Sequence, residues 1–527
     1  MNLSHSIFKP ASPRILAVVR AIAIIVILCG IFFRFYDLDR RIYWQDEAIT
    51  ALRIAGYTEV EFIAEVGDRA VTVAELQQQY QSPNPDHNLG DTLYSLASED
   101  PQLPPFYFIL ARWGAQLGGD TVTATRVVAV ILSILAFPCL FWLCWELFEN
   151  QWVGWVAMAL VAVSPFHLIF ANEARPYSLW TLTIFLSSAM LLRALKVPSR
   201  ASWGLYGVTV ALGLYSFLFN VLVIASHGLY TLGYQGWRWT KQTTAFCIAT
   251  IIGILAFLPW AIAVTLNLTQ ATDQTGWTSV SMPLGQLLNQ WLNNLNVVFI
   301  DGLDIPFAPL ELILRYGVLA LSIYALYYLI RTTQTRVWLF VISLIGVMGL
   351  TLILPDFIIG GRRSAVTRYA TPCYIGIELA VAYLLTTKMF SIHIQPLWRK
   401  VWQGFTIVLI MMGLFSQFKV ARSVFWWNKG PSNRFPQMAE MIAEAENPLV
   451  ITDGGLNKML AFSHQLDEDV SLYLLREEMP EFSLEDATIF FFNSSEGIIA
   501  DLTQSPNYTL DEIQPIGEIK LYKLTVN

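Results

Sequence analysis

The chain is dominated by apolar stretches of about 20 residues, each as long as a helix that crosses a bilayer. We predict about eleven transmembrane helices from them. They cover residues 15–33, 123–145, 152–171, 177–196, 203–217, 218–236, 243–265, 312–330, 337–354, 369–387 and 401–420. The junction near Phe219 is short, so residues 203–236 alternatively form one broken helix. The pattern therefore predicts a mainly α, polytopic membrane protein.

The composition fits this class and excludes an ordinary soluble domain. Hydrophobic residues make up 55% of the chain and charged residues 14%, with a mean hydropathy of +0.49. A net charge of −7 gives no sign of a nucleic-acid partner. All five cysteines lie in predicted helices, so we expect neither a disulfide framework nor a thiolate metal cluster.

Lysine and arginine placement sets the orientation, because basic residues concentrate in cytoplasmic loops. An internal N-terminus puts most short basic loops inside, including Arg193 and Lys196, and later Arg331 and Arg336. A long acidic loop and the acidic tail then fall outside.

The pattern divides the chain into two domains. Residues 1–425 form the transmembrane domain, and its first outer loop, 34–122, carries surface helices such as the one opened by Pro104 and Pro105. Residues 426–527 alternate helical and strand patterns, and predict a small α/β domain outside the membrane.

An adjacent acidic pair, Asp46 and Glu47, begins the first outer loop near the membrane surface. Carboxylates so close to the apolar phase are usually functional, and a general base is one such role. Polar residues of two further outer segments are expected on the same side: Glu173, Arg175 and Tyr177, and then Asp356, Arg362, Arg363, Arg368 and Tyr369. Arginine binds phosphate oxygens bidentately, so these residues predict chemistry on a lipid phosphate. Loop charges without a role are the alternative for Arg362 and Arg363.

The order of these motifs resembles the GT-C glycosyltransferases, in the branch of protein O-mannosyltransferases and bacterial aminoarabinose transferases. The resemblance is carried by the D-E pair, the surface helix opened by P-P, the EARPYSL segment and the late RYATP segment. It covers about the first 420 residues. It implies a polyprenyl-phosphate-linked sugar as donor, transfer with inversion, and a bacterial plasma membrane with the site facing the periplasm.

The family's functional positions match residues of this chain one by one. The resemblance implies that Asp46 is the base, with Glu47 beside it, and that Arg175, Tyr177, Arg368 and Tyr369 help to bind the donor phosphate. Two departures occur: Leu103 stands where a His or Lys precedes P-P, and Phe217 stands where the family often has His. Gln102 and Asp100 are polar neighbours, and partial replacement of the missing groups by them is one open alternative. The departures disfavour a bound divalent metal, and we assign no metal ligand and no cofactor.

The sequence thus predicts a glycosyltransferase that passes a hexosyl or pentosyl group to a lipid, glycan or protein acceptor outside the membrane. Two alternatives stay open. One is a flippase or transporter of lipid-linked sugars, although such proteins usually carry inverted repeats. The other is a non-catalytic membrane scaffold. The sugar, the acceptor, the oligomeric state and the role of the tail do not follow from the sequence.

Overall fold

The protein forms two compact units in a computed structural model that describes residues 13–119, 121–302, 308–391, 393–476, 487–504, 508–514 and 519–526. The helical unit comprises Met1–Tyr36, Pro101–Tyr107 and Ala129–Arg422. The sheet unit comprises Asp37–Asp100, Phe108–Val128 and Ser423–Asn527.

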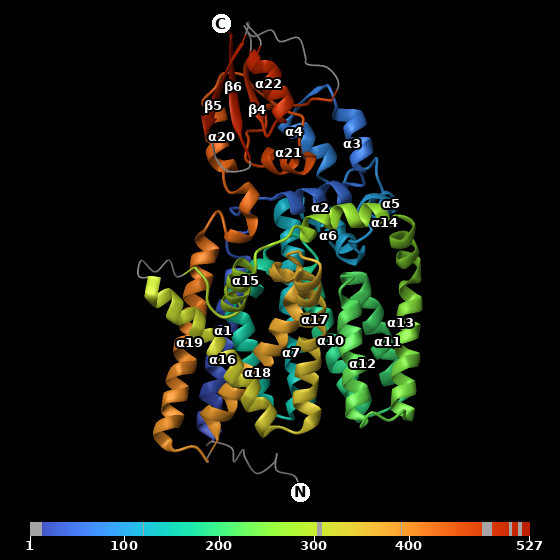
Figure 1. Cartoon of the computed structure of the whole chain (residues 1–527), viewed down its shortest axis with the longest axis vertical. Helices are drawn as coiled ribbons and strands as arrows, with labels where there is room; N and C mark the ends of the chain where they lie inside the picture. Colours follow the sequence, from blue (N-terminus) through green and yellow to red (C-terminus); the bar gives the residue numbers. More distant parts are fainter. Residues whose placement is uncertain are drawn as a thin grey trace. The chain divides into compact units, whose positions relative to one another are not determined.

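Long helices running side by side make up the helical unit (Figure 1). They are α1 (Pro13–Phe35), α7 (Thr121–Phe148), α8 (Gln151–Val163), α9 (Pro165–Ala171), α10 (Tyr177–Lys196), α11 (Arg200–Ser216), α12 (Asn220–Tyr234), α13 (Lys241–Leu266), α16 (Ala308–Thr332), α17 (Thr335–Ile358), α18 (Thr371–Phe390) and α19 (Pro396–Arg422). Shorter elements connect them: α14 (Leu268–Thr275), η3 (Gly276–Ser279), α15 (Leu284–Val297), η4 (Arg363–Ala365) and η5 (Thr367–Ala370).

Each predicted transmembrane segment overlaps these helices, although the segment 152–171 is divided between α8 and α9. Among the described residues, eight helices are long and apolar enough to cross a membrane, and α8 with α9 passes the same test as a pair bent by 62°. Helices α11 and α12 have only 17 and 15 residues, fewer than the roughly 20 that a straight span needs. The predicted polytopic, mainly α fold is confirmed: this is a multi-pass membrane protein.

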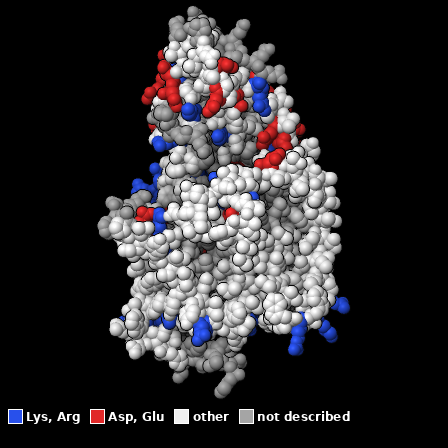
Figure 2. All heavy atoms as spheres, in the orientation of Figure 1, with Lys and Arg blue, Asp and Glu red and all other residues white. Residues whose placement is uncertain are grey.

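The surface of the helical unit matches this conclusion. Figure 2 shows a broad band without charge over this unit, with Lys and Arg side chains gathered at one of its ends. An uncharged band bounded by basic side chains is typical of a surface that faces lipid.

The break between α8 and α9 is stabilised by a buried arginine. Pro165 has no N–H to donate to the carbonyl of Val161, so that acceptor loses its helical partner. Arg34 Nη2 donates to Val161 O at 3.0 Å and its Nη1 donates to Ala162 O at 2.9 Å. Gln417 Nε2 also donates to Ala162 O, at 2.6 Å. A cation at a helix C-terminus also offsets the negative end of the helix dipole. The chain can therefore turn sharply here, just before Glu173.

The sheet unit contains elements from both ends of the chain. Its helices are α2 (Gln45–Ala55), α3 (Glu59–Val66), α4 (Val73–Glu75), η2 (Leu76–Tyr80), α5 (Leu89–Glu99), most of α6 (Phe106–Gly118), η6 (Trp427–Ser432), α20 (Phe435–Ala443), α21 (Leu456–Ser463) and α22 (Glu496–Gln504). Its strands are β1 (Ala70–Thr72), β2 (Pro448–Thr452), β3 (Ser471–Leu474), β4 (Thr488–Phe492), β5 (Tyr508–Gln514) and β6 (Leu521–Val526).

The six strands form one mixed sheet in the order β1-β3-β2-β4-β6-β5. Strand β2 pairs in parallel with β3 and β4, while β1, β5 and β6 pair antiparallel with their neighbours. The small α/β sheet predicted at the C-terminus is therefore confirmed. Its edge strand β1 comes from the first outer loop, with Val71 opposite Leu472. The division into domains 1–425 and 426–527 stays a prediction, since the compact unit that holds the tail also takes in Asp37–Asp100.

Successive side chains of the strands pack alternately into two hydrophobic cores, one on each face of the sheet. On β2, Val450 packs on the face covered by α2, α3, α20 and α21, and Ile451 packs on the opposite face with Leu502 of α22. Successive side chains of a strand point to opposite faces, so a sheet covered on both faces needs apolar residues at consecutive positions. Helix α2, which carries Asp46 and Glu47, is thereby packed into the core of the sheet unit.

We expect Leu472→Ala to loosen the first outer loop as well as the tail. Leu472 is 1% exposed, and a buried Leu→Ala change costs about 2–5 kcal/mol. Thermal unfolding and limited proteolysis within residues 67–75 measure the effect. Val60→Ala is the control, because Val60 is 72% exposed. Loss of stability without faster cleavage in that segment would show that β1 does not depend on β3.

Candidate functional site

Helix α2 presents the acidic pair in its first turn. Carboxylates there interact favourably with the positive end of the helix dipole. The helix ends at Gly56, whose φ of 105° lies in the left-handed region that favours glycine. Asp46 is partly exposed, whereas Glu47 is fully buried. The helix thus gives two neighbouring carboxylates opposite environments.

Glu47 is held by two buried cations. Arg126 binds it bidentately, with Nε and Nη2 each 2.8 Å from one carboxylate oxygen. Lys429 Nζ lies 3.0 Å from Glu47 Oε2. Arg126 and Glu47 are 0% exposed, and Lys429 is 4% exposed. A buried charge is tolerated only when it is paired and hydrogen-bonded, so these three side chains depend on one another.

The same two cations fix the segment that leads into α2. Arg126 donates to the carbonyls of Arg41 at 3.0 Å and Ile42 at 3.2 Å. Lys429 donates to Ile42 O at 2.9 Å. Sequence reasoning missed both residues. A lone basic residue within the apolar run of α7 was a usable signal for Arg126, but nothing in the sequence near Lys429 points to Glu47.

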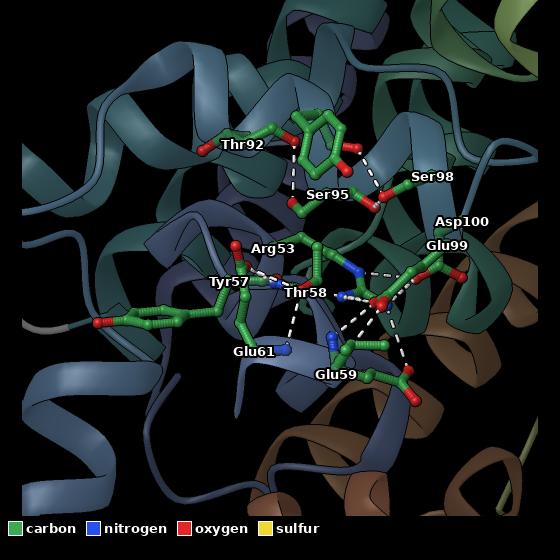
Figure 3. A network of polar contacts seen from close by, with 12 residues as sticks. Arg53, Tyr57, Thr58, Glu59, Glu61, Thr92, Ser95, Ser98, Glu99 and Asp100 are labelled. Carbon is green, nitrogen blue, oxygen red and sulfur yellow. Dashed lines mark hydrogen bonds and ion pairs between the residues drawn. The ribbon is translucent and has the colours of Figure 1, made fainter. Parts of the chain in front are cut away.

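Arg53 anchors the other end of α2, as Figure 3 shows. Its guanidinium lies 2.6 Å from Glu99, 2.8 Å from Asp100 and 3.2 Å from Glu59. Glu99 also accepts the backbone N–H of Glu59 at 2.6 Å. Arg53 therefore joins α2 to the start of α3 and to the end of α5.

The network shifts the pKa values of Arg53 and Glu59. Burial by itself would lower the pKa of Arg53, but the carboxylates of Asp100, Glu99 and Glu59 raise it overall. Burial raises the pKa of Glu59, and the opposing effect of Arg53 is weaker. One guanidinium shared by three carboxylates leaves the cluster with excess negative charge, which favours protonation of Glu59.

In the helical unit, the structure brings together three predicted residues of the donor-phosphate group. The guanidinium of Arg368 lies 5.7 Å from the ring centre of Tyr177 and 5.5 Å from that of Tyr369. Tyr177 begins α10 and is buried, while Arg368 and Tyr369 in η5 are partly exposed. Two segments almost 200 residues apart in the sequence thus meet.

The two neighbouring arginines, Arg362 and Arg363, differ in their surroundings. Arg363 is paired with Asp356: its Nη1 lies 3.2 Å from Asp356 Oδ1, and its backbone N–H donates to the same oxygen. Asp356 also accepts the N–H and hydroxyl of Ser364. Arg362 instead donates through Nε to the carbonyl of Trp277. Arg363 therefore stabilises the conformation of the loop. Arg362 forms no ion pair with a carboxylate among the described residues.

The remaining predicted residues are buried or half-buried. Glu173 and Arg175 are buried in the turn before α10, where the N–H of Arg175 donates to the carbonyl of Glu173 at 2.7 Å. Gln102 is half-buried, in a segment held by a hydrogen bond from Trp260 to the carbonyl of Pro101.

Both departures from the family pattern are packing positions. Leu103 is buried, and Phe217 lies 4.5 Å from Trp180, between ring centres. Within the described ranges, no group of three or more His, Cys, Asp or Glu side chains is arranged to hold a metal ion.

Comparisons with known proteins agree with this architecture. Residues 102–262, less than half of the chain, match the family model described as dolichyl-phosphate-mannose-protein mannosyltransferase. The structure of ArnT from Cupriavidus metallidurans bound to undecaprenyl phosphate is similar, with a TM-score of 0.52, 13% identity, and coverage of 97% of this chain and 98% of that one. ArnT from the same organism in the apo state gives a TM-score of 0.56 at 11% identity, over 98% of both chains.

This chain has the GT-C fold. No curated protein shows significant sequence similarity to it. At identities this low the structural likeness shows the fold alone, and the roles of individual residues stay predictions.

We expect Glu47→Gln to destabilise the protein while Asp46→Asn does not. Removing one partner of a buried ion pair costs about 3–5 kcal/mol, because the remaining charges stay buried without compensation. Asp46 is partly exposed, so its substitution leaves the core intact. Thermal unfolding in lipid nanodiscs compares the two variants. Equal melting temperatures would contradict the structural role of Glu47.

The Arg53 cluster predicts a pH-dependent difference between the parent and Glu59→Gln. The pKa of Glu59 is raised on folding, so its contribution to stability is fully present below the unfolded pKa and is lost as pH rises through the folded one. The melting temperature of the parent minus that of Glu59→Gln should fall as pH rises from about 4 to 8. Glu75, a half-buried residue that pairs with Arg69, is the control position. A difference that rises with pH would contradict the sign.

Proposed function

We propose that this protein transfers a sugar from a polyprenyl-phosphate-linked donor to a hydroxyl of a lipid, glycan or protein acceptor. Asp46 acts as general base, and Arg368, with Arg175, Arg362, Tyr177 and Tyr369, binds the donor phosphate. The site faces the exterior of a bacterial plasma membrane, the periplasm in this proposal.

The observation that carries the proposal is the contrast between Asp46 and Glu47. Glu47 is committed to Arg126 and Lys429, so it positions the helix. Asp46 is partly exposed, and the helix turn that carries it is held by the ion pairs of Glu47. A carboxylate held in place but open to solvent on one side is what a general base requires.

The reaction balances without a cofactor. Asp46 takes the proton of the acceptor hydroxyl, and the acceptor oxygen forms a bond to the anomeric carbon. The bond from that carbon to the phosphate oxygen breaks, and its electron pair leaves with the lipid phosphate. Guanidinium groups stabilise the negative charge that develops there. No acid is needed at the leaving group, because phosphate departs as a stable anion.

The comparisons support the donor class. In one of the similar structures, ArnT from Cupriavidus metallidurans is bound to undecaprenyl phosphate. The matched family model is described as dolichyl-phosphate-mannose-protein mannosyltransferase. Both support a lipid phosphate as the carrier of the sugar. Neither identifies the sugar or the acceptor for this chain.

We expect Asp46→Asn and Arg368→Ala to abolish sugar release from labelled polyprenyl-phosphate donors by the purified protein in lipid. Loss of a general base lowers kcat about 10²–10⁴-fold, and loss of a group that stabilises developing charge costs about 10²–10³-fold. Asp86→Asn and Arg331→Ala, which alter exposed residues, serve as controls.

The outcomes separate the alternatives. Turnover lost in both variants and kept in both controls supports the enzyme. A parent that moves intact lipid-linked sugar across vesicles, with Asp46→Asn equally active, supports a transporter. A parent that turns over no donor and transports none supports a scaffold.

A further inference from the structure

We propose that Trp277 is a positioning residue that holds Arg362 and Arg368 as a two-guanidinium clamp for the phosphate of the donor lipid. This inference rests on the proposed function and adds a residue that sequence reasoning did not single out.

One indole ring contacts both guanidinium groups. The Arg362 guanidinium carbon lies 5.2 Å from the centre of the Trp277 ring, and that of Arg368 lies 5.6 Å from it. Two positive charges this close to one ring repel each other. The negative face of an aromatic ring attracts cations within about 6 Å, and tryptophan does so most strongly. Trp277 therefore offsets part of the cost of gathering two cations before a ligand arrives.

The backbone around Trp277 is tied to the arginine loop. The N–H of Arg362 donates to the carbonyl of Thr278 at 2.9 Å, and its Nε donates to the carbonyl of Trp277 at 3.1 Å. Arg363 Nη2 donates to the hydroxyl of Ser279 at 2.9 Å. These bonds use backbone atoms or other side chains, so replacing the indole leaves them in place.

A glycine lets the loop approach this closely. Gly361 has a φ of 138°, and a Cβ there would lie 2.2 Å from Arg363 Nη1 and 3.1 Å from the carbonyl oxygen of Thr278. Any side chain at this position would push the loop away from η3. The chain therefore needs glycine just before Arg362 for the arginine to reach Trp277.

The clamp contains two arginines and not three. Arg363 is neutralised by Asp356, at 3.2 Å. The terminal nitrogens of Arg362 make no hydrogen bond with any described residue, so they are available to phosphate oxygens. Arg368 is enclosed by the rings of Trp277, Tyr177 and Tyr369. Ring contacts orient a planar guanidinium while its edge still donates hydrogen bonds. The donor phosphate is a diester with two oxygens that carry no substituent, and such oxygens accept hydrogen bonds from guanidinium groups.

The test compares Trp277→Leu with Trp277→Phe in the full-length protein in nanodiscs. The probe is a polyprenyl monophosphate, which measures binding without turnover. Loss of the indole should raise the Kd for this lipid about tenfold, and Phe should keep it within about threefold of the parent. In the donor assay, kcat/KM should fall by at least the same factor, because the two guanidinium groups also stabilise the charge that develops on the leaving phosphate.

A double-mutant cycle with Arg362→Met tests positioning against a merely structural role. If Trp277 acts through Arg362, Trp277→Leu should weaken binding much less in the Arg362→Met background than in the parent. Additive effects would overturn the inference. Trp145→Leu is the matched control, because Trp145 is 50% exposed and lies over no guanidinium among the described residues.

The two proposals fail in different ways. A Trp277→Leu variant with parental Kd overturns the clamp and leaves the proposed function untouched. A parent that binds the lipid phosphate through Trp277 but transfers no sugar overturns the proposed function and leaves the clamp standing. A parent that does not bind the lipid phosphate overturns both.

Discussion

The buried ion pairs of Glu47 are the interaction on which the sheet unit depends. Glu47, Arg126 and Lys429 come from three segments far apart in the sequence, and each is almost completely removed from solvent. None is tolerable alone in such surroundings, so the start of α2, the start of α7 and η6 must assemble together. This assembly sets the helix turn that carries Asp46. The tail is thereby joined to the first outer loop by charge as well as by the shared sheet.

The protein uses arginine for three different purposes within a small part of its structure. Arg34 satisfies carbonyls that Pro165 leaves without partners, and so stabilises a break between two helices. Arg363 forms an ion pair with Asp356 and stabilises a loop. Arg368 lies among the rings of Tyr177, Trp277 and Tyr369. Residue type alone does not distinguish these roles, because the immediate neighbours decide whether a guanidinium caps a helix, pairs with a carboxylate or packs among aromatic rings.

Much of the fold was accessible from the sequence because its cause is local. Apolar stretches of membrane-spanning length can be recognised without tertiary information, and the predicted segments coincide with helices, except that 152–171 is divided between α8 and α9. The alternating tail segments likewise identified β2, β3 and β4 of the small sheet, but not β5 and β6. In the candidate site, the motif EARPYSL and the RYATP segment were recognised, and Tyr177 and Arg368 do meet. The contribution of β1 to that sheet was not predicted, since a three-residue strand carries almost no pattern of its own.

The sequence by itself determined the class of protein, the membrane helices and the residue types offered to a lipid phosphate, because hydropathy and charge act at the level of single segments. Tertiary structure alone decided which carboxylate of the pair is buried, and that Arg363 pairs with a carboxylate. It also recruited Lys429 and Trp277, whose partners lie far along the chain. The physical reason is that desolvation and pairing depend on the atoms that surround a charge, and those atoms are assembled only when distant segments fold together.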